Sequence, residues 1–416
     1  MDRKRRFRKS LLGIVNSALA DMNAGTLLET ALKNYSIENN YILVAIGKAA
    51  WQMAKAAHEM LGNRIIDGIV ITKYEHSKGK IGNLEILEAG HPIVDENSLI
   101  ATQKVIEKVQ NLNENIHVLF LISGGGSALF EMPATGIQLS ELQAINRALI
   151  NSGASIKEIN AVRKHLSMVK GGRFAEMIFP ARIHSFILSD VVGEDLNSIA
   201  SGPTVADPAT SNDVIKILRK YGVNITKGIE SIILHETPKH ISNSDYTIIG
   251  NNKDLCKAVF KKAEKKDLDA ELISSKIEME VAEFADLIEE KIIQQRKTQQ
   301  IKPKLLIFGG EPVVKVSGKG TGGRNQHLAL LMAKRISEME NVFFLSVASD
   351  GSDGPTDAAG GIVDGYSWQE MKDLGIDPEK ALVEFDSYNC LLKSGDLIKT
   401  GATGTNLNDI LLALIY

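Results

Sequence analysis

Cysteine is scarce in this 416-residue sequence, which contains only Cys256 and Cys390. The two residues lie far apart along the chain, and neither belongs to a CxxC motif. A disulfide framework needs several cysteines, and structural zinc sites are usually built from closely spaced pairs. The sequence therefore argues against both, and it fits a protein kept in a reducing cytosol.

An excess of charge of either sign is also missing. Lys and Arg together number 48 and Asp and Glu 51, which gives a formal net charge of -3. A general nucleic-acid binder normally carries a strongly basic face or tail. No apolar run is long enough to span a bilayer. We therefore expect neither a nucleic acid nor a membrane as a partner.

The first 22 residues, MDRKRRFRKSLLGIVNSALADM, place a basic stretch before apolar residues. A secretory signal would need an unbroken apolar run, but Asn16 and Ser17 interrupt it. The apolar residues instead recur at helical spacing, at Phe7, Leu11, Ile14, Val15, Ala18 and Met22. We expect an amphipathic first helix and a cytoplasmic protein. A targeting peptide or a nucleic-acid-binding arm is the alternative.

Short apolar runs alternate with helix-like segments along most of the chain. Runs of this kind, rich in β-branched residues, are typical of parallel strands covered on both faces. Expected strands include 41–47, 65–72, 84–90, 117–122, 184–190, 246–250, 302–310, 313–316 and 342–350. The polar segment 237–245 contains Pro238 and marks a boundary. The sequence predicts two α/β domains, residues 1–240 and 241–416.

One of the expected strands leads into three consecutive glycines, in the segment HVLFLISGGGSALF at 117–130. Backbone N–H groups in such a loop, together with the following helix, can hold an anion such as phosphate. We assign this role to Ser123, Gly124, Gly125, Gly126 and Ser127. The loop lacks the GK[ST] of a P-loop and does not fit GxGxxG. A tight strand-to-helix turn with close packing is the alternative.

Two cations strengthen the case for an anion site. Lys48 and Arg324 each lie beside glycine at the start of an expected helix, where positive charge is unfavourable by about 0.3–1 kcal/mol. An anionic ligand would neutralise them; otherwise the side chains extend into solvent. Lys170 and Arg173, in VKGGRF, repeat the pattern, but there we expect a solvated turn.

Carboxylates follow two other expected strands. Asp190 ends HSFILSD and Asp350 ends VFFLSVASD. Carboxylate oxygens are ligands that Mg²⁺ prefers, directly or through water. Further along the second loop, Asp353 and Asp357 are either ligands or caps of turns.

Three smaller features complete the candidate site. His91 precedes a proline in AGHPIVDENS and is either a substrate contact or a hydrogen-bonded loop residue. Glu311, in GGEP, follows an expected buried strand and is either a polar ligand or a turn residue. The segment TGATGTNLNDI at 400–410 is expected to lead into a helix that Asn406 or Asn408 caps.

Taken together, the motifs resemble one family, the class II glycerate kinases, whose C-terminal half is the MOFRL domain. The resemblance covers nearly the whole chain in the expected order, through LISGGGSALFEMP, GHPIVDENS, HLSMVKGGRFAE, ILSDVVGEDLNSIASGPTVADP, GGRNQHLAL, SDGSDGPTDAAGGIVDG and TGATGTNLND. It implies a Rossmann-like α/β/α N-terminal domain, a smaller α/β C-terminal domain and an active site in the cleft between them. It also implies ATP- and Mg²⁺-dependent phosphorylation of D-glycerate, usually at the 2-hydroxyl.

The family's active-site lysine and arginine match Lys48 and Arg324. On this basis we expect Lys48, Arg324 and Asp190 to be catalytic and Asp190 and Asp350 to hold the metal. Expected substrate contacts are Lys48, Arg324, His91, Glu311 and Asn325. The partners would be ATP and glycerate, with the protein a monomer or homodimer.

Two other functions stay open at this point. An NAD(P)H-dependent hydroxypyruvate reductase would use a similar sheet, but the first strand-to-helix turn reads AIGKAA and not GxGxxG. A non-catalytic protein that binds sugar acids or nucleotides is the third possibility.

Overall fold

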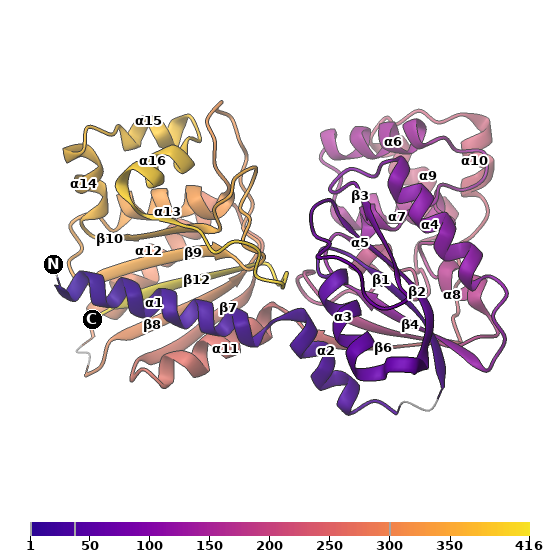
Figure 1. The fold of residues 1–416 in the computed structure, drawn as a ribbon. Coiled ribbons are helices and arrows are strands. Elements are labelled where there is room, and N and C mark those ends of the chain that lie inside the picture. The colour runs from indigo at the N-terminus through magenta and orange to yellow at the C-terminus, as the bar shows by residue number, and fades with distance from the viewer. Residues whose placement is uncertain (1, 37–38, 299–300) are drawn as a thin grey trace. The chain divides into compact units, whose positions relative to one another are not determined.

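The computed structural model describes residues 2–36, 39–298 and 301–416 and divides into two compact units (Figure 1). The first unit is Ala24–Ile249. The second unit joins the residues up to Asn23 with Gly250–Tyr416. Each unit contains one six-stranded sheet covered by helices, so the predicted pair of α/β domains is confirmed.

The sheet of the first unit has the strand order β3-β2-β1-β4-β5-β6. Its strands are β1 Asn40–Ile46, β2 Ile65–Lys73, β3 Glu85–Ala89, β4 Ile116–Ile122, β5 Ile183–Leu188 and β6 Ser244–Gly250. The pairs from β3 to β5 are all parallel. This is the Rossmann order, in which ligands bind beyond the carboxyl ends of the strands where the order reverses. That point lies between β1 and β4.

Helices cover this sheet and also form a separate apolar cluster. They are α2 Ala24–Lys33, α3 Ala50–Leu61, α4 Glu96–Val109, α5 Gly126–Leu129, α6 Leu139–Asn151, α7 Ile156–His165, α8 Arg173–Ile178, α9 Ser211–Lys220 and α10 Lys227–Ile233, with 3-10 turns at Gly62–Arg64 and Ile199–Ser201. Residues of α4 and α8 share a core with β1 and β4. Residues of α6, α7, α9 and α10 pack on one another around Leu142, Val162 and Val214.

The sheet of the second unit has the order β11-β10-β9-β12-β8-β7. Its strands are β7 Asp269–Ile277, β8 Lys304–Gly310, β9 Val342–Ala348, β10 Gly360–Asp364, β11 Leu397–Ile398 and β12 Asp409–Ile415. Its helices are α1 Asp2–Asp21, α11 Asn252–Glu264, α12 Val281–Arg296, α13 Arg324–Arg335, α14 Ser367–Asp373, α15 Pro378–Val383 and α16 Ser387–Ser394. Apolar residues of α12 and α13 pack with Phe308, Phe344 and Leu411 of the sheet.

Three expectations for the second unit were wrong. Its sheet is mixed, because β12 runs antiparallel to both β8 and β9. The segment TGATGTNLNDI leads into the buried strand β12, so neither Asn406 nor Asn408 caps a helix there. Residues 313–316 form no strand beyond a single bridge between Val313 and Glu280. An apolar run such as DILLALI fits a buried strand or a buried helix equally well, and periodicity alone does not separate them.

The boundaries also differ from 1–240 and 241–416. Strand β6 pairs in the first sheet, so that unit extends to Ile249. Helix α1 belongs to the second unit, where Phe7 stacks on Tyr416 at 4.3 Å between ring centroids. The expected amphipathic helix is confirmed, with Leu11 and Ile14 fully buried. The apolar face of a helix indicates that the helix packs on another part of the chain, but it does not indicate which part.

Among the described residues, no single helix is long and apolar enough to cross a bilayer. The bent pair Lys4–Asp21 and Ala24–Lys33 meets the length and composition requirement only when its two helices are taken together.

Candidate active site

The turns that follow β1 and β4 pack directly on each other at the reversal point of the first sheet. The N–H of Lys48 donates to the carbonyl of Gly124 at 2.8 Å, and the N–H of Ala49 donates to Ser123 Oγ at 3.0 Å. A Cβ on Gly47 would lie 2.3 Å from Ser123 Oγ. The close-packing interpretation of this loop is therefore correct for its first residues.

The next glycine brings three expected site residues together. Gly125 has a φ of 89°, which favours glycine. A Cβ at this position would lie 2.9 Å from His91 Cδ2 and 3.5 Å from Lys48 Cγ. In the described chain the N–H groups of Gly124 and Gly125 have no protein acceptor. The loop therefore presents two donors beside a lysine and a histidine, which is a suitable arrangement for an anion.

Lys170, which was expected to lie in a solvated turn, is buried and binds the end of this loop. Lys170 is fully buried, and its Nζ donates to the carbonyls of Ser127 and Phe130 at 2.8 and 2.9 Å. It also forms an ion pair with the buried Glu131 at 2.8 Å. The solvated-turn expectation for Lys170 was wrong, because its charge is compensated inside the protein. Ser127 Oγ lies 2.8 Å from Ser201 Oγ.

A cavity of about 460 Å³ opens beside the glycine loop within the first unit. One end is formed by His91, Gly125 and Ser127. The remaining lining comes from the loop after His91, from α5 and from α6 and α7: Pro92, Ile93, Val94, Ala128, Glu131, Gln143, Asn146, Arg147, Ile150 and Arg163. The sequence interpretation found the glycine-loop end of this cavity and missed the helical side. No motif marked α6 or α7, since their residues converge only in the fold.

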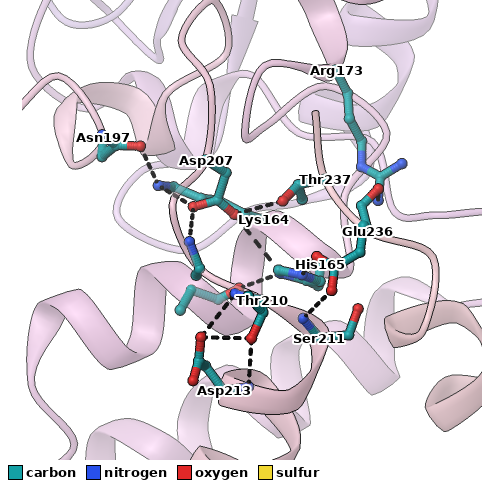
Figure 2. A network of polar contacts seen from close by, with 12 residues as sticks. Lys164, His165, Arg173, Asn197, Asp207, Thr210, Ser211, Asp213, Glu236 and Thr237 are labelled. Carbon is teal, nitrogen blue, oxygen red and sulfur yellow. Dashed lines mark hydrogen bonds and ion pairs between the residues drawn. The ribbon is translucent and has the colours of Figure 1, made fainter. Parts of the chain in front are cut away.

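A second polar region of the first unit surrounds Asp207 (Figure 2). The buried Asp207 carboxylate accepts hydrogen bonds from Lys164 Nζ at 3.2 Å and Thr237 Oγ1 at 2.9 Å. Lys164 also donates to Asn197 Oδ1 at 3.0 Å. A smaller cavity of about 300 Å³ adjoins this network. The network ties the loop after β5 to α7 and to the segment before β6. Asp190, two residues beyond β5, lies half-buried near the start of that loop.

In the second unit, Arg324 is held by two carboxylates. Its Nε and Nη2 donate to the fully buried Asp409 at 2.6 and 3.1 Å, and its Nη1 donates to Glu311 at 2.6 Å. Burial opposes the charged form, but these carboxylates outweigh it and hold the pKa of Arg324 above its usual range. Arg324 therefore needs no ligand to neutralise it, contrary to the argument from sequence. The remaining N–H groups on Nη1 and Nη2 stay available for a further acceptor.

Asn325 and Asp353 serve the start of α13. Asn325 is fully buried, and its side chain contacts Asp353 Oδ1 at 3.3 Å and Ser346 Oγ at 2.6 Å. Asp353 accepts from the backbone N–H groups of Asn325 and Gln326 and so caps the helix. This arrangement positions Arg324 and directs Asn325 into the protein. Asp353 follows the capping interpretation, and Asp357 is exposed beside Lys399 at 2.8 Å.

The loop after β9 carries Asp350, whose Oδ1 accepts from the N–H of Ser352 at 2.9 Å. This loop is tied to residues 400–408, because Thr403 Oγ1 donates to Ser349 O at 2.5 Å. Within the described residues, no group of three or more His, Cys, Asp or Glu side chains is placed to hold a metal ion. Asp190 and Asp350 therefore belong to no closed protein cage.

Comparison with known proteins shows which family this chain belongs to. Residues 10–234 match a domain of unknown function, DUF4147, and residues 304–409 match the MOFRL family. A D-glycerate 2-kinase from Thermotoga maritima is 48% identical over 412 residues, which is 98% of each chain. The chain belongs to the class II glycerate kinase (MOFRL) family. The resemblance noted in the sequence motifs is thus confirmed.

Other family members agree in fold and differ in the activity named. The crystal structure of a Thermotoga maritima glycerate kinase has a TM-score of 0.93 and 48% identity, and the match covers 99% of this chain and all of that one. A relative from Agrobacterium vitis, 36% identical over 90% of this chain and 87% of its own length, is named provisionally as a hydroxypyruvate reductase. In this MOFRL-family chain, the DUF4147 match contains Lys48 and the glycine loop, and the MOFRL match contains Arg324 and Asp350.

Proposed function

We propose that this protein is an ATP-dependent D-glycerate 2-kinase. The observation that carries the proposal is the glycine loop at the reversal point of the first sheet. There the N–H groups of Gly124 and Gly125, beside Lys48, have no acceptor among the residues that the structure describes. Phosphoryl transfer needs chiefly positioning and stabilisation of charge spread over the phosphoryl oxygens. A loop of this kind supplies both without covalent chemistry.

The two units contribute different groups in this proposal. The backbone of Gly124–Ser127 holds phosphate oxygens of ATP, and Lys48 neutralises the transferring phosphoryl group. Arg324, oriented by Asp409 and Glu311, uses its remaining N–H groups to grip a phosphate or the glycerate carboxylate. Glu311 thereby acts through Arg324, and His91 lies close enough to Gly125 to contact the phosphate or the acceptor.

Asp190 is the first candidate to accept the proton of the 2-hydroxyl, and Asp350 is the second. Mg²⁺ in kinases is commonly held by one or two carboxylates together with substrate phosphates. Asp190 and Asp350, each in a loop that follows a strand, suit that mode. The ion, when bound, would neutralise charge on the ATP phosphates.

The experiment incubates the protein with ATP, Mg²⁺ and D-glycerate and couples the product to enolase with or without phosphoglycerate mutase. Product consumed without the mutase is 2-phosphoglycerate. We expect Lys48→Ala and Arg324→Ala each to lower kcat/KM by about 100-fold or more. Lys55→Ala is the matched control, because Lys55 is exposed on α3 and forms a surface i,i+4 bridge with Glu59. Near wild-type turnover in both active-site variants would contradict the proposal.

The reductase name of the Agrobacterium vitis relative makes hydroxypyruvate reduction the second candidate. A dinucleotide in a Rossmann sheet lies against the first strand-to-helix turn. In this protein that turn packs closely on Ser123, since a Cβ on Gly47 would lie 2.4 Å from the Ser123 carbonyl oxygen. The close packing argues against a dinucleotide at this turn. Oxidation of NADH by hydroxypyruvate in the absence of ATP would favour the reductase. Binding of ATP and glycerate with no turnover across a range of Mg²⁺ concentrations would favour a non-catalytic binding protein.

The proposed setting is the cytoplasm, with ATP and glycerate as small-molecule partners. The near balance of charge, -3 over the chain, supports the absence of a nucleic-acid partner. A monomer or a homodimer is proposed, and light scattering after size-exclusion chromatography distinguishes them.

A further inference from the structure

The cavity beside the glycine loop is larger than the acceptor needs. Its volume is about 460 Å³, within the range of roughly 300–1,000 Å³ common for pockets that enclose drug-sized ligands. A three-carbon acid would fill only a small part of it. The cavity therefore has room for a much larger molecule that extends away from Gly125.

One face of α6 is devoted to this cavity. Four of its residues follow helical spacing at i, i+3, i+4 and i+7, and all four line the cavity: Gln143, Asn146, Arg147 and Ile150. Three of them are polar or charged, and Arg147 and Ile150 are exposed. A face of this composition suits a ligand with both hydrogen-bonding and apolar parts.

The polar residues on the helical side are only partly engaged by the protein. Arg147 forms no hydrogen bond or ion pair with any residue the structure describes. Arg163, on α7, donates from Nε to Asn146 Oδ1 at 2.9 Å. Gln143 donates to the carbonyl of Val94 at 2.8 Å, which ties the loop after His91 to α6. Glu131 adds no net negative charge, because it is paired with Lys170.

Two aliphatic residues that line the cavity are exposed. Ile93 is 63% exposed and Ile150 is 56% exposed, although both line the same hollow. Leaving two large aliphatic side chains in water is unfavourable unless something covers them. A flat, largely apolar ring system between them would remove that exposure.

We propose that this cavity binds the nucleoside part of the phosphoryl donor. The base lies against Ile93 and Ile150, the α6 face contacts base and ribose, and the phosphates extend toward Gly125 and Ser127. This assignment rests on the proposed kinase function for the identity of the donor. It places the base in the first unit alone.

The test substitutes Ile150→Glu and measures ADP binding to the full chain by calorimetry, together with KM for ATP and for D-glycerate. A carboxylate there replaces the apolar contact with the base by a charge that prefers water, so we expect ADP affinity to fall by about tenfold or more and KM for ATP to rise similarly. KM for glycerate should stay within about twofold. Ile156→Glu is the matched control, since Ile156 is 59% exposed on α7 and does not line the cavity. It should change none of these values.

Ile93→Glu, in the loop after His91, provides a second test if circular dichroism shows that Ile150→Glu folds poorly. A rise in KM for glycerate alone would overturn the proposal and make the cavity the acceptor site. Unchanged ADP affinity in both variants would also overturn it. If the wild-type protein binds ADP but does not phosphorylate glycerate, the proposed function fails while the binding comparison still decides the nucleoside site.

Discussion

Lys170 is a single residue whose burial links stability to the shape of the glycine loop. Its ammonium is enclosed by the carbonyls of Ser127 and Phe130 and by the Glu131 carboxylate. Burial is the main influence on the pKa of Lys170 and lowers it, while Glu131 opposes that shift. The three oxygen partners therefore offset part of the cost of burying this ammonium.

We predict that Lys170→Met lowers the free energy of unfolding of the first unit by about 3–5 kcal/mol, because Glu131 is left buried without its cation. Urea denaturation followed by circular dichroism measures the loss. The double variant Lys170→Met/Glu131→Gln should regain part of it, because no buried charge then remains uncompensated. A double variant no more stable than Lys170→Met would show that the ion pair is not the source of the effect.

His165, in the network of Figure 2, is a residue whose protonation makes the stability of the first unit depend on pH. Its ring is fully buried, Nδ1 lies 3.0 Å from the carbonyl of Ala161, and Nε2 lies 3.6 Å from the Glu236 carboxylate. Burial is the largest influence and lowers the pKa of His165 below its usual 6.5. The unfolded chain therefore takes up the proton first as the pH falls, and the folded state loses stability below about pH 6.5.

We predict that His165→Gln flattens the decline in unfolding free energy between about pH 7 and pH 5. The other histidines are unchanged in this variant, so the difference between the two pH profiles isolates His165. Urea titrations at several pH values provide the measurement. Parallel profiles for wild type and variant would show that His165 does not titrate differently on folding.

The site residues that could be predicted are those marked by local sequence. Lys48 and Gly125 were found because glycine and a cation at a strand-to-helix turn have a local physical meaning. Lys170 was misjudged and Arg163 and Asp409 were missed, because their partners lie far away in the sequence. Asp409 in particular lies 85 positions from Arg324, at the start of a strand that was expected to be a helix.

At the scale of elements, α1 likewise depends on contacts with residues that lie far away in the sequence. Its apolar spacing predicted a helix, but its attachment depends on acids that come from β10 and the loop before β11. Arg8 Nη2 donates to Asp396 Oδ1 at 2.5 Å, and Nη1 lies 3.7 Å from Asp364 Oδ2. Both acids are buried, with 2% of each residue exposed. The cation on α1 therefore compensates two charges that the sheet cannot expose to water.

We predict that Arg8→Ala lowers the unfolding free energy of the second unit by roughly 3 kcal/mol, because Asp396 and Asp364 lose their buried cation. Arg5→Ala is the control, since Arg5 is exposed on the same helix and contacts no described side chain. Thermal melting compares the two variants. Equal losses for both would mean that helix propensity, and not the buried charge, accounts for the change.

At the scale of the whole molecule, the chain builds its second unit from two separated segments. Residues up to Asn23 join Gly250–Tyr416, and the complete first unit is inserted between them. This insertion explains why most strands were predicted correctly in both halves, whereas the division at residues 240 and 241 was not. Strand signals are local, whereas the assignment of α1 depends on a contact that spans the inserted unit.

This arrangement predicts that residues 250–416 do not fold stably by themselves. Helix α1 buries Phe7, Leu11, Ile14, Val15, Ala18 and Leu19. At about 1.5–3 kcal/mol for each of the five large apolar side chains, its removal costs roughly 8–15 kcal/mol, comparable with the whole stability of a domain. Ala24–Ile249 contains its own sheet and cores and should fold when produced separately.

Circular dichroism melting of Gly250–Tyr416, with and without residues 1–23 joined through a flexible linker, measures the difference. We expect a cooperative transition only with the helix attached. Equal melting of both proteins would show that α1 is dispensable for folding.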